Sequence, residues 1–266
     1  PRLPWSNRGG IVYERLRQFI VTRTRLGSPV IRRAVRAAKR TRRGVFEALG
    51  SDRYSHPALH DLDRKLFAYL PERDGVFIEA GAFDGYWQSN TYWFERFRGW
   101  SGVLIEPIPQ LAAQARRERP RSQVFEFALV APDFPEEHVR MRFGGTMSIL
   151  VPDSDGGSER AIAHAERGAS IALAESYDLE VPTKTLSAVL DEAGVSDVDL
   201  LSLDVEGNES EVLEGLDLSR HAPQYIVVEM QDQDERRPLI DRLLEPRYEF
   251  VERLSGWDCL FRRRGA

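Results

Sequence analysis

The stretch that decides the fold reads FIEAGAFDGYWQSNT and covers residues 77–91. It begins with apolar residues typical of a buried strand and then breaks into glycines on either side of an acidic residue. Such a break allows two interpretations: a tight structural turn, or a floor on which a small molecule lies. The remainder of the sequence bears on the choice between them.

Segments with strand and helix patterns alternate from about residue 51 onward. We expect strands at GVFIEAG (75–81), GVLIEP (102–107), QVFEFALV (123–130), VDLLSLDVEG (198–207) and QYIVVEM (224–230). Helices are expected over 89–97, 110–119 and 186–194, and from about residue 209. The last segment, 248–264, reads as two strands joined by a Ser-Gly turn. This alternation indicates an α/β fold with a mainly parallel sheet and an antiparallel pair at its edge.

Composition excludes several classes of protein. The chain has 266 residues, 42% of them hydrophobic, which suffices for one sizeable domain and an appendage. No apolar run reaches the roughly 18 residues of a membrane span, and no segment has the pattern of a secretory signal. The single Cys259 excludes an internal disulfide and a cysteine-based zinc site. These features favour a cytoplasmic location, with association at the inner face of the membrane as an alternative.

Charge divides the chain, whose net charge is −5, into a basic and an acidic part. Residues 1–53 contain fourteen Lys or Arg and three acidic side chains, whereas the remainder contains 23 basic and 39 acidic ones. We expect a basic arm of two amphipathic helices over residues 1–50 and a main domain over 51–266. The arm could contact anionic lipid or glycan, for which we consider residues 11–43. It could instead pack on the body or on a second subunit of a homo-oligomer. Nucleic acid is disfavoured, because the arm lacks interleaved aromatic residues.

Carboxylates recur where the predicted strands end. Four of the five ends carry one: 79–85, 106–107, 204–208 and 229–231, with 128–129 as the exception. Ligands of parallel α/β sheets bind beyond the carboxyl ends of the strands. Because a strand end needs no carboxylate for stability, this repetition indicates a site.

The spacing of glycines and acids indicates the ligand. Gly81 permits a tight turn and Gly85 relieves crowding at the next helix. Glu106, 21 residues after Gly85, can accept both hydroxyls of a ribose. The Gly-x-Gly-x-x-Gly pattern of dinucleotide sites is absent, and Asp84 would repel a diphosphate. A loop with carboxylates suits a cationic nucleoside such as S-adenosylmethionine, which carries a sulfonium and an ammonium.

At this point a family resemblance can be stated. The stretch FIEAGAFDGYWQSNTYWFERFRGWSGVLIEPIP (77–109) resembles the core of the FkbM family of S-adenosylmethionine-dependent methyltransferases. VPTKTLSAVLDEAGVSDVDLLSLDVEGNESEVLEG (181–215) and YIVVEM (225–230) resemble its second signature, in the expected order. The resemblance covers about residues 52–262. It implies a Rossmann-like class I methyltransferase fold with a seven-stranded sheet, and O-methyl transfer to hydroxyls of sugars, glycoconjugates, glycolipids or polyketide-type natural products.

The resemblance also implies roles for single residues. The cofactor would be held by Glu79, Gly81, Ala82, Phe83, Asp84, Gly85, Ser89, Asn90, Thr91, Glu106, Pro107, Phe127, Ala128 and Leu129. Within this set Glu106 would take the ribose, the Ser-Asn-Thr helix start the cofactor carboxylate, and residues 127–129 the adenine. Asp204, with Glu206 nearby, would face the reacting centre.

Transfer of a methyl group to a hydroxyl requires a base. Asp204 is our first candidate for a catalytic role, followed by Glu206 and His164, and His138 is also considered. His164 lies in the segment 144–180, which we expect to be irregular and to cover the substrate. Trp87, Ser148 and Glu229 are candidates for substrate binding. If a divalent metal such as Mg²⁺ takes part, Asp204, Glu206 and Glu229 are its candidate ligands.

Two other functions stay open at this level. A nucleic-acid methyltransferase could use the basic arm to hold phosphates, although the acidic body speaks against it. A non-catalytic module with this fold could use the arm to dock to a membrane or partner. For Glu209 the sequence predicts only a helix-capping role, because carboxylates stabilise the first turn of a helix.

Overall fold

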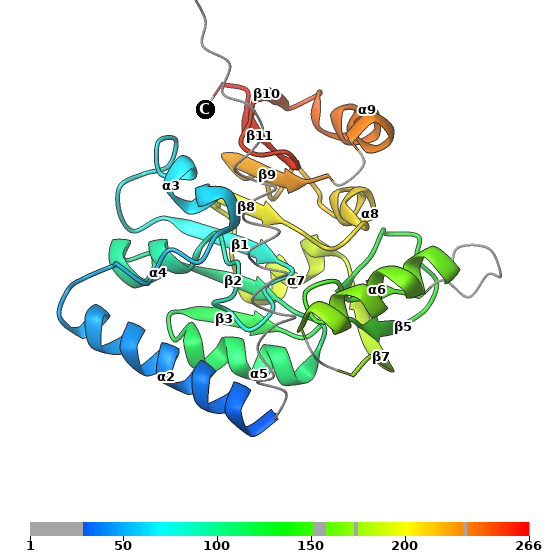
Figure 1. The fold of residues 1–266 in the computed structure, drawn as a ribbon. Helices are drawn as coiled ribbons and strands as arrows, with labels where there is room; N and C mark the ends of the chain where they lie inside the picture. Colours follow the sequence, from blue (N-terminus) through cyan, green and yellow to red (C-terminus); the bar gives the residue numbers. More distant parts are fainter. Residues whose placement is uncertain (1–28, 152–157, 173–174, 231–232, 266) are drawn as a thin grey trace, which may run out of the picture. The chain divides into compact units, whose positions relative to one another are not determined.

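The computed structural model describes residues 29–151, 158–172, 175–230 and 233–265 (Figure 1). The chain forms two compact units, Pro1–Arg53 and Tyr54–Ala266. In the first unit, α2 (Pro29–Ala48) is a helix of 20 residues. Along α2, the apolar side chains Val35 and Val45 are exposed. The first predicted arm helix lies outside the described residues.

The second unit is built on a seven-stranded sheet, as predicted. Its order is β10-β11-β9-β8-β1-β2-β3. The strands are β1 (Val76–Ala80), β2 (Ser101–Ile105), β3 (Ser122–Phe125), β8 (Leu200–Leu203), β9 (Tyr225–Glu229), β10 (Tyr248–Arg253) and β11 (Asp258–Arg263). β9, β8, β1, β2 and β3 run parallel to one another, whereas β11 runs antiparallel to both β9 and β10.

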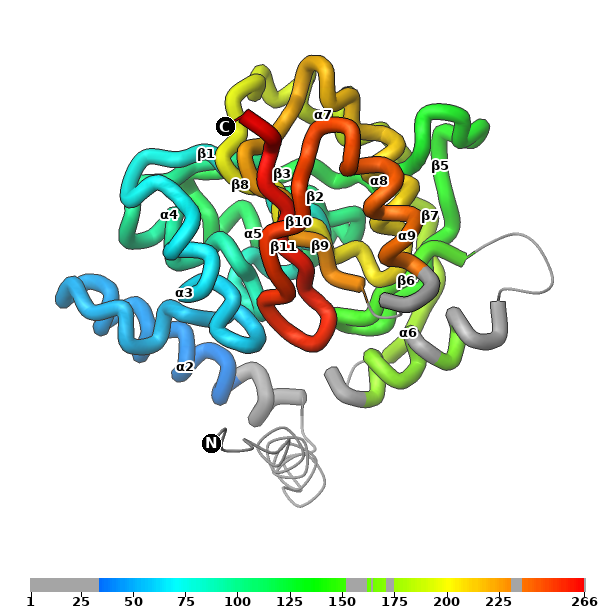
Figure 2. The backbone as a smooth tube through the Cα atoms, turned by 90° about the horizontal axis from the view of Figure 1, so that it is seen from above, coloured from blue at the N-terminus to red at the C-terminus, as the bar shows by residue number. Residues whose placement is uncertain are grey.

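The strands carry apolar side chains on both faces of this sheet, so helices cover both faces. On one face, Ile78, Val103 and Leu201 pack with α7 (Leu186–Ala193), α8 (Glu209–Glu214) and α9 (Gln233–Leu244). On the other, Phe77, Leu104 and Leu200 pack with α3 (Leu62–Leu66) and α4 (Tyr92–Arg98). Figure 2, which looks from above, shows α3 and α4 on one side of the strands and α8 and α9 on the other. The 3-10 turn η1 (Leu59–Asp61) precedes α3, and α5 (Pro109–Glu118) joins β2 to β3.

A second, four-stranded sheet corrects two of our predictions. Its order is β4-β7-β5-β6, formed by β4 (Ala128–Leu129), β5 (His138–Phe143), β6 (Ile149–Leu150) and β7 (Tyr177–Lys184). The predicted strand 123–130 is therefore divided between β3 of the large sheet and β4 of the small one. The segment 144–180, predicted to be irregular, contains β6, helix α6 (Ser158–Ala172) and the start of β7.

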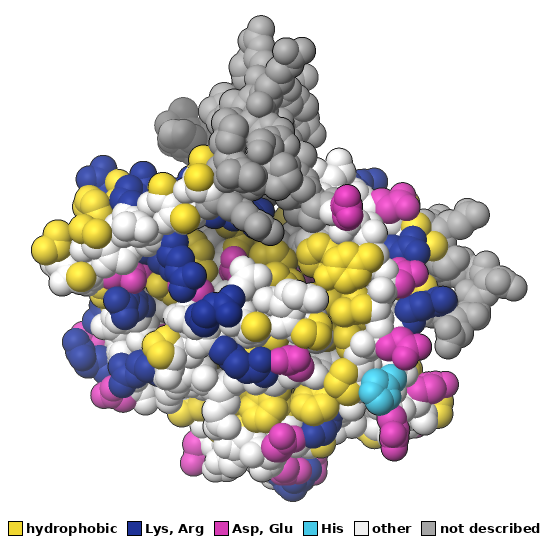
Figure 3. Space-filling view, turned by 90° about the horizontal axis from the view of Figure 1, so that it is seen from below, with side chains coloured by type: hydrophobic (Ala, Val, Ile, Leu, Met, Phe, Trp, Pro, Cys, Tyr) yellow, Lys and Arg dark blue, Asp and Glu magenta, His cyan; other side chains and the backbone are white. Residues whose placement is uncertain are grey.

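Smaller differences concern helices. α4 begins at Tyr92, three residues after its predicted start, and α9 was not predicted, since Pro238 lies inside it. No helix in the described ranges is long and apolar enough to cross a bilayer. On the face drawn in Figure 3, Lys and Arg side chains lie among Asp and Glu rather than in a separate field.

One backbone contact fixes how the strand ends meet. Gly81 follows β1 with φ +86°, and a Cβ atom placed there would lie 1.8 Å from the carbonyl oxygen of Asp204, which follows β8. Because Gly81 has no Cβ atom, the ends of the neighbouring strands β1 and β8 can approach each other at this turn.

We predict that Gly81→Ala lowers the free energy of unfolding by at least about 3 kcal/mol, because strain and overlap with backbone act together. Gly194→Ala is the matched control, since Gly194 also has positive φ (+67°) but open space around it. For that variant we expect a loss of about 1 kcal/mol. Urea unfolding measures the free energy of unfolding of both variants. Equal losses would show that the close approach of Gly81 to Asp204 does not contribute to the effect.

Candidate functional site

A pocket opens at the carboxyl ends of the central strands. Its volume is about 950 Å³, part of it open to solvent, and its walls come from the ends of β1, β2, β4 and β8 and from the loop after β5. Most predicted site residues line it: Glu79, Gly81, Ala82, Phe83, Trp87, Ser89, Asn90, Glu106, Pro107, Phe127, Ala128, Leu129, Ser148, Asp204 and Glu206. Sequence reasoning missed other lining residues, among them Gln88, Met141, Thr146 and Ser202.

Several predicted residues do not line this pocket. Asp84 turns its Oδ1 back to accept hydrogen bonds from the backbone N–H groups of Tyr86 and Trp87, at 3.0 and 2.7 Å. Gly85 packs against α5, where a Cβ would lie 2.8 Å from Cα of Ala115. Asp84 and Gly85 therefore determine the conformation of the loop, but they do not line the pocket. His138 is exposed at the start of β5. His164 lies in α6, but its side chain is outside the described part of the structure.

Glu79, at the end of β1, organises the loop that follows it. Its carboxylate accepts hydrogen bonds from the hydroxyls of Ser89 (2.8 Å) and Thr91 (2.6 Å) and from the backbone N–H of Asn90 (2.8 Å). Ser89 Oγ also accepts from the backbone N–H of Tyr92 at 3.0 Å, at the start of α4. The hydroxyls that we expected to meet a cofactor carboxylate are thus engaged with Glu79, and Thr91 is buried away from the pocket.

Arg119, which no sequence motif indicated, supplies the counter-charge. Its side chain is 1% exposed and pairs with Glu79 (3.2 Å) and Glu95 (2.7 Å). Arg119 also donates to Thr91 Oγ1 at 2.7 Å and to the carbonyl of Gly85 at 3.2 Å. A buried charge is tolerated only when it is paired and hydrogen-bonded, and this network satisfies that condition. The loop 81–91 is therefore held by a fully buried ion cluster.

Glu106, at the end of β2, is the buried carboxyl suited to a ribose. Its Oε2 accepts from the backbone N–H of Phe83 at 2.8 Å, and its Oε1 from that of Ile108 at 2.9 Å. Burial raises the pKa of Glu106 to about 8, against the opposing effect of these two hydrogen bonds. Each oxygen retains a lone pair that can accept from a ligand hydroxyl.

Asp204 and Glu229 form a second buried carboxyl group, shared between the ends of β8 and β9. Burial and the neighbouring charge of Glu229 raise the pKa of Asp204 well above its usual range. Burial raises the pKa of Glu229 to about 7, and the two carboxyls are hydrogen-bonded. Two carboxyls this close share one proton near neutral pH. Glu229 itself does not line the pocket, but its partner does.

The loop after β8 holds Asp204 and Glu206 in place. Glu206 has φ +54° and Gly207 φ +109°. Glu209 stabilises this turn, because its carboxylate accepts from the backbone N–H groups of Val205 (3.2 Å) and Gly207 (2.9 Å). Arg236 from α9 pairs with Glu209 at 2.8 Å. Glu209 thus does more than the helix-capping role predicted for it.

The pocket presents acceptor atoms that lack donors among the described residues. Asn90 donates from Nδ2 to Ser202 at 3.0 Å, while its Oδ1 is buried without a partner. Asp204 Oδ1 is likewise buried without a hydrogen-bond partner among the described residues. Buried acceptors without partners are costly, so a ligand that carries donors or positive charge fits here. An ammonium, a sulfonium and ribose hydroxyls meet these requirements, whereas a phosphate does not.

The metal site that we considered is not present in the described part of the chain. No group of three or more His, Cys, Asp or Glu side chains lies within reach of a common metal ion there. Asp204, Glu206 and Glu229 thus do not form such a group.

The fold and pocket together define a class I methyltransferase, and comparison with known proteins agrees. Residues 79–262 match the family described as "Methyltransferase FkbM domain". The match covers more than half of the chain, so the protein belongs to the FkbM family of S-adenosylmethionine-dependent methyltransferases. The resemblance stated from the sequence is confirmed. A search of curated protein sequences finds no significant match.

Solved structures are similar only at a distance. A methyltransferase FkbM from Methylobacillus flagellatus KT shares 15% identity, with a TM-score of 0.47 over 82% of this chain and 52% of that one. The present chain thus spans about half the length of that protein. A TehB-like SAM-dependent methyltransferase from Corynebacterium glutamicum shares 13% identity, with a TM-score of 0.41 over 89% of this chain and 100% of that one. TM-scores this low carry no conclusion about fold or substrate.

The raised pKa of Glu106 gives a prediction for the ligand-free protein. A carboxyl whose pKa is raised on folding contributes stability below its unfolded pKa, and that stability is lost as pH rises toward the folded value near 8. We expect the stability of wild type relative to Glu106→Gln to fall by on the order of 3 kcal/mol between pH 5 and 9, since Gln does not ionise. Thermal unfolding across this pH range measures the difference. A difference independent of pH would show that Glu106 is not desolvated.

Proposed function

We propose that this protein transfers the methyl group of S-adenosylmethionine to a hydroxyl of a sugar, a glycoconjugate or a polyketide-type natural product. The observation that carries the proposal is the buried Asp204–Glu229 pair with Asp204 Oδ1 unpartnered in the pocket. A hydroxyl that donates to this atom would satisfy it and would place its oxygen beside the group that takes its proton.

The cofactor would be bound by residues already in position. Glu106 would accept the two ribose hydroxyls, and Asn90 Oδ1 would accept from the ammonium. Phe127, whose ring lies 4.1 Å from the ammonium of Lys184, would lie beside the adenine with Ala128 and Leu129. Residues 81–83 would form the floor beneath the methionine part. When bound, S-adenosylmethionine supplies an electrophilic methyl group on a sulfonium.

The chain's own contribution is to orient the acceptor and to hold its proton. A sugar hydroxyl is a weak nucleophile, so a base must accept its proton as the new O–C bond forms. The Asp204–Glu229 pair carries one negative charge once it shares a single proton, and the pKa of Glu229 near 7 suits transfer near neutral pH. Positioning in the pocket supplies a further part of the acceleration.

The nucleic-acid alternative fits this pocket less well. Asp204, Glu206 and Glu106 all line it, and this acidic surface would repel the phosphates on either side of a target base. A neutral acceptor with hydroxyl donors meets no such repulsion.

Two substitutions separate cofactor binding from chemistry. Glu106→Ala removes the two hydrogen bonds to the ribose hydroxyls, and we expect the Kd for S-adenosylmethionine to rise about 100-fold. Asp204→Asn keeps the shape of the side chain but abolishes its basicity, and we expect cofactor affinity within about threefold of wild type with kcat lowered about 100- to 10,000-fold. Titration calorimetry measures binding, and mass spectrometry of methylated acceptors, with host glycan extracts as the first source, measures turnover.

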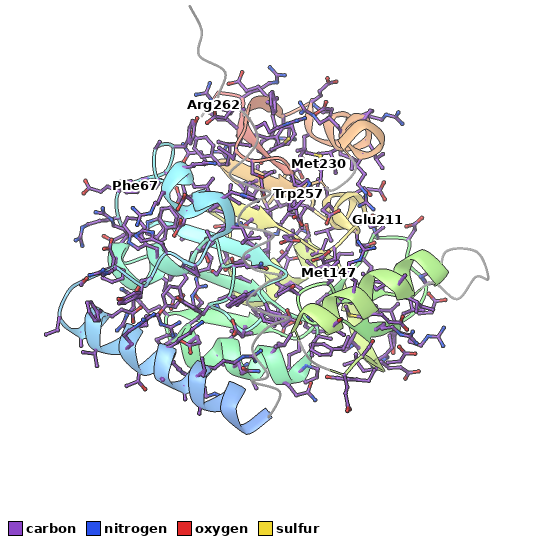
Figure 4. The ribbon with its side chains drawn as sticks, in the orientation of Figure 1. Phe67, Met147, Glu211, Met230, Trp257 and Arg262 are labelled. Carbon is purple, nitrogen blue, oxygen red and sulfur yellow. The ribbon has the colours of Figure 1, made fainter. Side chains whose placement is uncertain are left out.

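The control is Glu211→Gln, an exposed carboxylate on α8 outside the pocket, which should change neither quantity (Figure 4). Unchanged affinity in Glu106→Ala would remove the cofactor assignment. Normal turnover in Asp204→Asn would remove Asp204 from the mechanism.

A further inference from the structure

An exposed tryptophan stands in a rigid turn close to the catalytic pair. Trp257 lies between β10 and β11, and 46% of its surface is exposed. Its backbone is fixed at both polar atoms: the N–H donates to Ser255 Oγ at 3.0 Å, and the carbonyl accepts from the N–H of Met230 at 2.9 Å. Figure 4 shows Trp257 beside Met230, the residue that follows Glu229 at the end of β9. The indole is therefore presented to solvent from a fixed position.

A strained segment supports this indole from the other side. The ring of His60 meets that of Trp257 edge to face, with centroids 5.9 Å apart. His60 and Asp61 have φ of +55° and +56°, in the left-handed region that residues other than glycine seldom adopt. Just beyond them, Lys65 Nζ donates to the carbonyl of Leu254 at 2.5 Å. Such strain persists where the surroundings enforce it, and it concentrates at binding sites. In Figure 2 the segment before α3 lies next to the β10–β11 turn.

Neither of these two rings lines the pocket, but contacts of their chain segments reach residues at and beside it. On one side, Ala58 forms a β-bridge with Gln88, which lines the pocket beside Trp87. On the other, Asp258 lies opposite Glu229 in the β11–β9 register, and its charge contributes to the raised pKa of Glu229. Trp257 thus directly precedes Asp258, whose charge raises the pKa of Glu229 in the Asp204–Glu229 pair.

We propose that Trp257, backed by His60, forms the outer wall of the acceptor site and stacks on the ring whose hydroxyl is presented to Asp204. Trp87, which is 48% exposed, lines the pocket itself from the loop 81–91. The proposal rests on the proposed function, because it assigns residues to the acceptor of that reaction. No sequence motif pointed to Trp257 or His60 as residues of the acceptor site.

The residues around Trp257 indicate which kind of acceptor ring would bind there. Asp204, Glu229 and Asp258 are buried or half-buried carboxyls, which accept hydrogen bonds from hydroxyls and repel anions. A tryptophan face is apolar and negative, so it binds the C–H face of a saturated ring. A neutral pyranose offers both surfaces: hydroxyls at its edge for the carboxyls and an apolar face for the indole. A phosphorylated or carboxylated ring would be disfavoured.

Saturation-transfer NMR on the full chain tests the proposal. The probes are the neutral methyl glycosides of glucose, galactose, mannose and rhamnose, added with and without saturating S-adenosylhomocysteine. We expect transfer to the ring C–H protons of at least one glycoside, reduced about fivefold or more in Trp257→Ala and largely retained in Trp257→Phe. Phe250→Ala, which removes another exposed aromatic ring from the same hairpin, is the matched control and should leave the signal unchanged.

Two results would overturn the assignment: transfer that is unaffected in Trp257→Ala, or transfer to none of the four glycosides. Calorimetry with S-adenosylhomocysteine keeps this outcome separate from the proposed function. Intact cofactor binding without a Trp257 effect would contradict only the acceptor wall, whereas absent cofactor binding would contradict the proposed function. In kinetic assays the wall predicts a raised KM for the acceptor in Trp257→Ala, with the Kd of the cofactor unchanged.

Discussion

The buried ion cluster of Arg119, Glu79 and Glu95 is the constraint on which the rest of the site depends. Glu79 ends the central strand β1, and its carboxylate gathers Ser89, Asn90 and Thr91 around itself. Without Arg119 this carboxylate would be buried with no counter-charge, a condition that costs roughly 3–5 kcal/mol when one partner is removed. The cluster determines where α4 begins and how the loop 81–91 passes under the pocket. It also turns the backbone so that Phe83 N–H reaches Glu106.

The site and its supporting loops contain two kinds of buried carboxyl, and the difference between them supports the proposed chemistry. Glu79 and Glu209 are paired with Arg119 and Arg236, and they hold loops. Glu106 and the Asp204–Glu229 pair have no cationic partner among the described residues, and burial raises their pKa values. A fold that only needed stability would gain by replacing such groups with apolar ones. A bound ligand that brings positive charge and hydroxyl donors, as in the proposed function, would account for their presence.

The sequence predicts the sheet and the strand-end carboxylates well, since an apolar run that stops at an acidic residue is a local signal. Arg119 could not be predicted, because in the helix end that contains Arg116 and Arg117 nothing local marks the arginine that becomes buried. Its burial follows from the packing of Gly85 on Ala115, a contact across 30 residues of sequence. Within the small sheet, β4 and β6 could not be recognised as separate strands, because they have two residues each, too few to show a period. Met141 and Thr146 reach the pocket only through tertiary contacts.

Arg119 holds the loop 81–91 in place through its ion pair with Glu79. Amide hydrogen exchange in Arg119→Met tests it most directly, with the exposed pair disrupted in Arg220→Met as control. The backbone N–H groups of Asn90 and Tyr92 donate to Glu79 and Ser89. We expect both amides to exchange at least about tenfold faster in Arg119→Met, while amides of β8 and β9 keep the rates of the control. Unchanged protection at Asn90 and Tyr92 would contradict the account.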